Sequence, residues 1–166
     1  MKHILLLVLM FMVFITPCTF AADGKVYENQ EYKFHVTLPD DWQLSEHKVA
    51  MVEAHAPGKF PSVMFFCDPV SKHKTNVDGQ ESEVSWYITS MKKSHPDIVL
   101  MEKNNVIISN NNAIRVVLSN NNVSSTTYFV YTNNYVFCII ATGLVSTLDK
   151  DQSTYNQIIS TVKILD

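Results

Sequence analysis

The sequence predicts a domain of the α/β (α+β) class, in which an antiparallel β-sheet meander lies between helices. Residues 32–42 alternate apolar and polar side chains, which is typical of a half-buried strand. Short asparagine clusters separate four extended segments, and turns of that length cannot hold crossover helices. The four segments are residues 98–103 or 98–109, 113–119, 123–132 and 135–142. Two further segments, residues 82–94 and 149–162, have apolar residues at helical spacing.

The first 21 residues have the layout of a secretory signal peptide. Lys2 precedes an apolar run over residues 4–15, and small residues follow near Ala21. The run is shorter than the roughly 20 apolar residues that span a bilayer, which argues against a membrane anchor. We expect cleavage after Ala21, leaving residues 22–166 as a single secreted or periplasmic domain without an integral membrane span.

Cys18 raises the alternative of a lipoprotein, because lipoprotein signals end at a cysteine that becomes acylated. Such signals carry a small residue just before that cysteine, and here the preceding residue is Pro17. This departure favours an ordinary signal peptide, and lipidation of Cys18 stays open at the level of the sequence.

The composition favours a soluble domain and argues against nucleic acid as a partner. Hydrophobic residues make up 46% of the 166 residues, enough for a core, and the formal net charge is −3. No run of five or more basic residues occurs, so electrostatic support for binding nucleic acid is missing. Glycine-rich phosphate loops and paired cysteine motifs are also absent, and we therefore expect no cofactor.

The first predicted strand has one clearly apolar face, made of Tyr32, Phe34, Val36 and Leu38. Pro39 ends the strand, and Trp42 returns a large apolar ring toward the same core. Residues 25–31, before it, are mostly polar and are expected to form an arm. Residues 49–56 and 60–68 are expected to pair as a hairpin, because Pro57 and Gly58 between them form a strong turn signal.

Residues 71–81 are almost entirely polar, so a solvated loop that serves recognition is predicted there. The helix of residues 82–94 then ends at Pro96. Apolar residues occupy both faces of residues 128–131 and 135–141, which predicts two central strands covered on both sides. The closing helix has Asp149 and Asp151 near its start, where they suit the helix dipole.

Two cysteines remain after removal of the signal, Cys67 and Cys138. In an oxidising compartment one disulfide between them is possible. Both lie inside apolar runs, so the alternative is two small buried hydrophobic residues on two strands. The sequence leaves the choice open, because a bridge needs Cα atoms within roughly 7 Å of each other.

The search for catalytic chemistry yields only weak candidates. His47 and His55 lie eight residues apart with Glu53 between them, and with nearby acids they form the alternative hypothesis of a metal-binding protein or hydrolase. A zinc site normally needs three or four convergent protein ligands, which favours exposed polar positions instead. We therefore predict no catalytic, cofactor-binding or metal site.

The segment YKFHVTLPDDW, at residues 32–42, resembles the opening motif of the PsbP-like superfamily. The order of a strand pair, a helix, a long meander and a closing helix is similar to that superfamily over residues 25–166. The resemblance implies an α/β/α sandwich, and it extends to small secreted bacterial members such as DcrB. It also implies docking on larger partners, so we expect a non-catalytic accessory module that binds another envelope or secreted protein.

Overall fold

The computed structural model describes residues 24–45 and 50–165. Its strands, in chain order, are β1 (Gly24–Asn29), β2 (Phe34–Pro39), β3 (Gln43–Ser45), β4 (Val52–His55), β5 (Ser62–Pro69), β6 (Val99–Ile108), β7 (Asn111–Ser119), β8 (Val123–Tyr131), β9 (Tyr135–Leu144) and β10 (Lys163–Ile164). Its helices are the 3-10 helices η1 (Val70–Lys72) and η2 (Val145–Thr147) and the α-helices α2 (Val77–Ser94) and α3 (Leu148–Ser160). Among these residues, no helix has both the length and the apolar character needed to cross a bilayer.

The strands form two antiparallel sheets. The larger sheet has the order β3-β4-β5-β9-β8-β7-β6, and the smaller one has the order β1-β2-β10. Consecutive strands β6 to β9 pair with their neighbours in sequence, as a meander requires. The predicted antiparallel meander is therefore confirmed, while the division into two sheets was not predicted.

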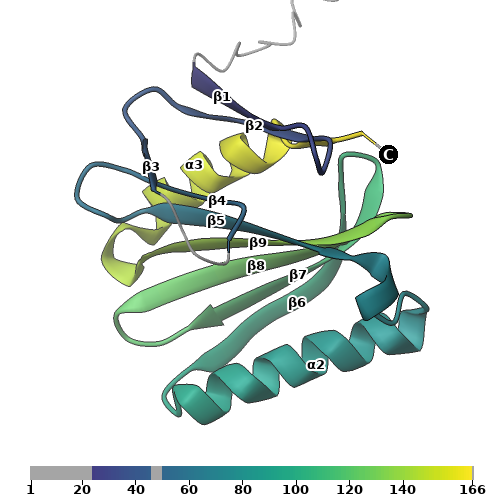
Figure 1. The fold of residues 1–166 in the computed structure, drawn as a ribbon. Coiled ribbons are helices and arrows are strands. Elements are labelled where there is room, and N and C mark those ends of the chain that lie inside the picture. The colour runs from purple at the N-terminus through teal and green to yellow at the C-terminus, as the bar shows by residue number, and fades with distance from the viewer. Residues whose placement is uncertain (1–23, 46–49, 166) are drawn as a thin grey trace, which may run out of the picture.

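Helices cover both faces of the larger sheet, which confirms the predicted sandwich. Figure 1 shows α2 and α3 on opposite sides of this sheet, with β1 and β2 on the side of α3. Val84 of α2 packs on Ile114 and Val116 of β7, whereas Tyr155 and Ile158 of α3 belong to the core on the other face. Alternation of side chains along each strand thus supplies two separate cores.

The alternating strand predicted first is β2, and its apolar face is buried. Phe34, Val36 and Leu38 expose 1%, 1% and 2% of their surface, and Trp42 exposes 4%. The ring of Phe34 lies 5.1 Å from that of Phe65 in the larger sheet, so β2 joins the two sheets through one core.

Two of the sequence expectations for the N-terminal and helical regions are wrong. The polar residues predicted as an arm form β1, which pairs with β2 over its whole length. The segment predicted as a recognition loop contains η1 and the first turn of α2, because the helix begins at Val77 rather than near Ser82. Gly79 lies where a Cβ would stand 2.3 Å from Cβ of Lys74, so the start of α2 is packed against the preceding turn.

The asparagine clusters form turns by different means. Ser109 and Asn110 have φ of 49° and 62°, the left-handed pair that a tight β6–β7 hairpin requires. In the β7–β8 turn, the Asn120 side chain instead accepts hydrogen bonds from the backbone N–H groups of Asn122 and Val123, at 2.9 and 2.8 Å. Asn110 is the only asparagine with a left-handed backbone among the residues that the structure describes.

Candidate functional site

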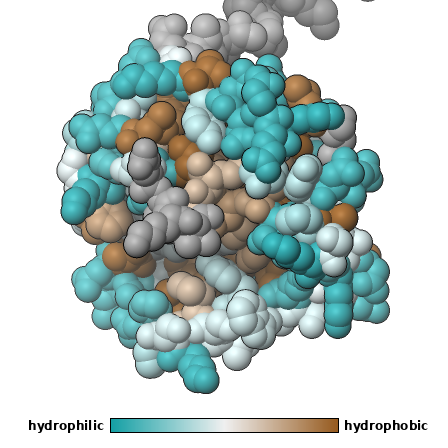
Figure 2. Space-filling model, in the orientation of Figure 1, coloured by the Kyte–Doolittle hydropathy of each residue, from teal (hydrophilic) through white to brown (hydrophobic). Residues whose placement is uncertain are grey.

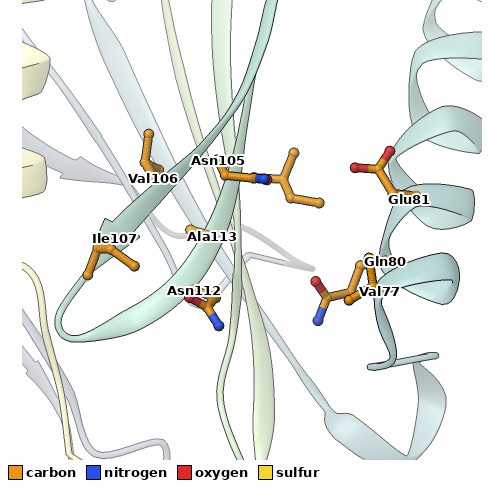
Figure 3. A pocket seen from close by; sticks show the side chains of 9 residues that line it. Val77, Gln80, Glu81, Asn105, Val106, Ile107, Asn112 and Ala113 are labelled. Atoms are coloured by element: carbon orange, nitrogen blue, oxygen red, sulfur yellow. The ribbon is translucent and has the colours of Figure 1, made fainter.

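A hollow of about 340 Å³ lies between the first turns of α2 and the β6–β7 hairpin. Figure 3 shows Gln80 of α2 and Asn112 of the hairpin extending toward the same space from opposite walls. The residues that line this hollow are Val77, Gln80, Glu81, Asn105, Val106, Ile107, Asn112, Ala113 and Ile114.

A second hollow of about 450 Å³ adjoins the first, since Gln80 and Asn112 line both. It reaches toward the β8–β9 turn and is lined by Val70, Thr75, Gln80, Asn110, Asn111, Asn112, Tyr131, Thr132 and Asn133. We call the two hollows together the amide cleft, because carboxamide side chains of asparagine and glutamine recur along both.

Local structure holds the walls of the amide cleft in place. The left-handed backbone at Asn110 reverses the chain between β6 and β7. Asn112 is therefore fixed in position as the second residue of β7. On the opposite wall, Gln80 donates to the carbonyl of Thr75 at 2.7 Å and ties α2 to the preceding turn. At the β8–β9 turn, the Thr132 hydroxyl accepts the backbone N–H of Tyr135 at 3.0 Å.

Several polar groups of the amide cleft make no hydrogen bond to the part of the chain that the structure describes. The side chains of Asn105, Asn112 and Asn133 are exposed and have no such partner. Tyr131 exposes only 7% of its surface, and its hydroxyl oxygen is fully buried, near Glu83 but without a hydrogen bond of good geometry to the residues that the structure describes. A buried polar group without a partner costs free energy, so Tyr131 marks a position where a bound group can compensate.

Tyr131 lies next to a small polar cluster. The Glu83 carboxylate accepts from the backbone N–H of Lys74 at 3.2 Å and lies 3.2 Å from Nδ1 of His73. Burial, with the nearby charge of Glu83, raises the pKa of Tyr131 above its ordinary value. The hydroxyl is therefore protonated at neutral pH, and the Glu83 carboxylate lies near enough to interact with its proton.

The amide cleft is close to electrically neutral. Its one carboxylate, Glu81, forms an ion pair with Lys103 of β6. The remaining polar groups are carboxamides and hydroxyls, which both donate and accept. Such a wall suits an uncharged ligand that also alternates donors and acceptors, and a polypeptide backbone has this chemistry.

Exposed hydrophobic side chains flank this polar wall. Val77 and Ile107 line the first hollow from α2 and from β6, and they expose 76% and 66% of their surface. Elsewhere, the face seen in Figure 2 is largely hydrophilic around its edges, with hydrophobic residues gathered in a hollow near its centre. Apolar side chains beside unpaired polar groups are typical of surfaces that bind other proteins.

The candidate metal site at His47 and His55 receives no support from the residues that the structure describes. His55 ends β4, where its Nδ1 lies 3.0 Å from the Ala56 carbonyl and its Nε2 lies 3.1 Å from Oγ of Ser45. His47 lies outside the described residues. Within residues 24–45 and 50–165, no group of three or more histidine, cysteine or acidic side chains is arranged to hold a metal ion.

Cys67 and Cys138 are both free in the structure. They lie on the neighbouring strands β5 and β9, but Cys67 faces Phe137 across the ladder and Cys138 faces Phe66. Cross-strand partners share a face of the sheet, so the two thiols lie on opposite faces and cannot be bridged in this register. Burial raises the pKa of both thiols to about 12, which keeps them protonated and poorly nucleophilic at neutral pH.

No family model matches the chain, and no curated protein resembles it in sequence. Solved structures do resemble it in fold. The cyanobacterial PsbP (CyanoP) of Synechocystis sp. PCC 6803 has a TM-score of 0.70 at 10% identity, over 89% of this chain and 96% of that one.

Two other solved structures give the same picture. LpqN of Mycobacterium tuberculosis, described as involved in cell envelope biogenesis, has a TM-score of 0.59 at 13% identity, over 89% of this chain and 88% of that one. Protein PA94 of Pseudomonas aeruginosa has a TM-score of 0.52 at 14% identity, over 82% and 94%. None of these bears on the likeness to DcrB, which stays a prediction. The matches show that this chain has the PsbP-like fold.

Proposed function

We propose that this protein is an exported, non-catalytic accessory module that binds a segment of another envelope or secreted protein in the amide cleft. The observation that carries the proposal is the combination, in one cleft, of three features. These are the carboxamides of Asn105, Asn112 and Asn133, which have no partner among the described residues, the buried Tyr131 hydroxyl, and the exposed side chains of Val77 and Ile107. A protein partner can supply both backbone groups that hydrogen-bond to the polar side chains and apolar side chains that cover Val77 and Ile107.

The polar part of such a contact is a set of hydrogen bonds between side chains of the cleft and the partner's backbone. Each backbone amide has one donor and one acceptor, and each carboxamide can satisfy both. Binding that exposes the Tyr131 hydroxyl would also give it an acceptor on the partner, a gain of roughly 1 to 3 kcal/mol because a poorly satisfied buried group is relieved.

The apolar part comes from Val77 and Ile107. Covering these two side chains removes apolar surface from water and strengthens the contact without fixing its sequence. The signal-peptide pattern of residues 1–21 supports an exported location for the encounter. The fold also resembles that of LpqN, a protein described as involved in cell envelope biogenesis. This resemblance is consistent with an envelope location for this protein.

Site-specific photo-crosslinking in the native host tests the proposal. A photoreactive amino acid replaces Ile107 in the cleft, and a control carries it at Val26 on β1, which is equally exposed at 66%. We expect a defined crosslinked partner from the cleft position, different from a second copy of this chain, that is absent from the control. Equal crosslinking at both positions, or none at the cleft, contradicts the proposal.

The captured partner then allows a quantitative test with Tyr131→Phe, which removes only the hydroxyl. We expect the free energy of unfolding to stay equal or to rise, because an unsatisfied polar atom is lost, while the affinity falls by roughly tenfold. Asn112→Ala weakens binding in the same way, and Asn121→Ala, at an exposed asparagine of the β7–β8 turn, is the matched control. Unchanged affinity for Tyr131→Phe and Asn112→Ala would show that the partner binds elsewhere.

A further inference from the structure

Strand β6 forms one edge of the seven-stranded sheet and is open to solvent along most of its length. It is the last strand in the sheet order, and in the described part of the chain no strand pairs with its outer side. Seven of its ten residues are exposed, among them Met101 and Ile107 at 65% and 66%. A long edge of this kind has free backbone donors and acceptors and can pair with another strand.

Charged side chains usually protect such an edge, but those of β6 are already paired within the chain. Lys103 forms an ion pair with Glu81 of α2, and Glu102 accepts from Arg115 of β7 at 2.6 Å. Lys103 thus lies on the face of the sheet that α2 covers, and Glu102 lies on the opposite face of the sheet. Because both charges are compensated, they oppose an approaching strand less than free lysines would.

The alternation of β6 restricts how two copies of the strand can meet. A two-fold axis perpendicular to the sheet pairs them antiparallel and keeps each side chain on its own face. In the regular ladder from Glu102 to Ile108, odd-numbered residues therefore face odd-numbered ones, and even-numbered residues face even-numbered ones. An axis at Glu102 or at Lys103 would set two like charges directly opposite each other, which is destabilising.

An axis at Asn104 avoids this repulsion. It sets Asn104 opposite its own copy, where two carboxamides can hydrogen-bond to each other. Lys103 then faces Asn105, and Glu102 faces Val106, so every charge meets an uncharged residue. The same register brings the β-bulge at Met101 beside the exposed Ile107 of the other copy. The apolar surface of both side chains is then removed from water.

We propose that two copies of this protein associate through β6, antiparallel about a two-fold axis at Asn104, so that their large sheets continue into one another. An axis one residue further along, at Asn105, would place Lys103 and Glu102 opposite Ile107 and Ile108. It is less favourable because both charges then meet aliphatic residues, whereas the axis at Asn104 sets only Glu102 opposite one. The association does not depend on the proposed partner. It places the Lys103 of one copy beside the Asn105 that lines the amide cleft of the other.

Charge swapping at the axis tests the proposal by sedimentation equilibrium of the purified protein. We expect a reversible dimer for the unchanged protein over the micromolar to millimolar range. Asn104→Lys alone and Asn104→Glu alone each set like charges face to face and weaken the dimer by about fivefold or more. An equimolar mixture of the two variants restores it as a heterodimer, whereas Asn121→Lys leaves the dimer unchanged.

A cysteine at the axis gives an independent test of the register. Strands paired about Asn104 hold its two Cα atoms roughly 4.5 to 5.5 Å apart, within the range of a disulfide. Asn104→Cys should therefore form a covalent dimer under mild oxidation, and Asn121→Cys should not. A monomer at all concentrations overturns the proposal, as does a dimer that neither charge variant weakens or a cysteine variant that stays uncrosslinked.

Discussion

Replacement of each of the two tryptophans by alanine tests the predicted core directly. Trp42 exposes 4% of its surface and belongs to the core between the two sheets, whereas Trp86 on α2 exposes 71%. An aromatic side chain buries about 150 to 250 Å², which at about 25 cal/mol per Å² amounts to about 4 to 6 kcal/mol. Measured losses for such truncations are about 3 to 5 kcal/mol, and we expect this range for Trp42→Ala.

Trp86→Ala is the matched control, since it makes the same chemical change on an exposed helix face. We expect its free energy of unfolding to change by about 0.5 kcal/mol or less. Urea unfolding followed by far-UV circular dichroism measures both variants against the unchanged protein, with equal m-values required for the comparison. Similar losses for the two variants would show that the face of the strand before Trp42 has been assigned wrongly.

Three further predictions concern the two thiols, the packing of α3 and the N-terminus. Iodoacetamide should label the partly buried cysteines of β5 and β9 far more slowly in the folded protein than in urea at pH 8, and equal labelling rates would contradict this. Their pKa is raised from 9.0 to about 12, so stability also falls as pH rises through that interval. Gly143→Ala should cost roughly 1 to 3 kcal/mol in urea unfolding, because its Cβ would lie 2.7 Å from Oδ2 of Asp151 and 2.8 Å from the Tyr155 hydroxyl, and unchanged stability would refute the contact. N-terminal sequencing of the exported protein should begin at Ala22, and an acylated Cys18 would contradict it.

Strand β2 was predictable because its signal is local. The side chains of Phe34, Val36 and Leu38 alternate with polar ones, and a period of two places them on one face whatever the rest of the chain does. The same holds for β8 and β9, whose apolar residues on both faces correctly indicated central strands. In such segments the alternation alone decides which side chains are buried.

The start of α2 was missed because its first turn is polar. Composition suggested a loop up to residue 81, yet Asn76 occupies the N-cap position and Asp78 lies in the first turn, both of which favour a helix start. Hydrophobic spacing begins only at Val84, about two turns later, so that signal alone places the boundary too late. The cap residues were the better guide to this boundary.

The amide cleft could not be derived from the sequence. Its walls come from the start of α2, the β6–β7 hairpin and the β8–β9 turn, and only the tertiary fold brings them together. The asparagines had a sufficient local explanation as turn residues, so the sequence offered no reason to expect that the side chains of Asn112 and Asn133 have no hydrogen-bond partner within the described part of the chain. Whether the two cysteines could bond depended likewise on register, because a shift of one residue moves a thiol to the opposite face.

Partner binding and self-association both involve β6 and share the side chain of Ile107, but their other contacts use different atoms. The cleft uses side chains that point toward α2, such as Asn105, together with Tyr131 on β8. Pairing of two copies uses the backbone of the outer edge, with Asn104 on the other face at the axis. Tyr131→Phe should therefore weaken binding of the partner and leave the dimer intact. Asn104→Lys should weaken the dimer and leave binding of the partner unchanged. If one substitution removed both, the partner would have to bind across the two-fold axis, with the cleft completed by Lys103 of the second copy.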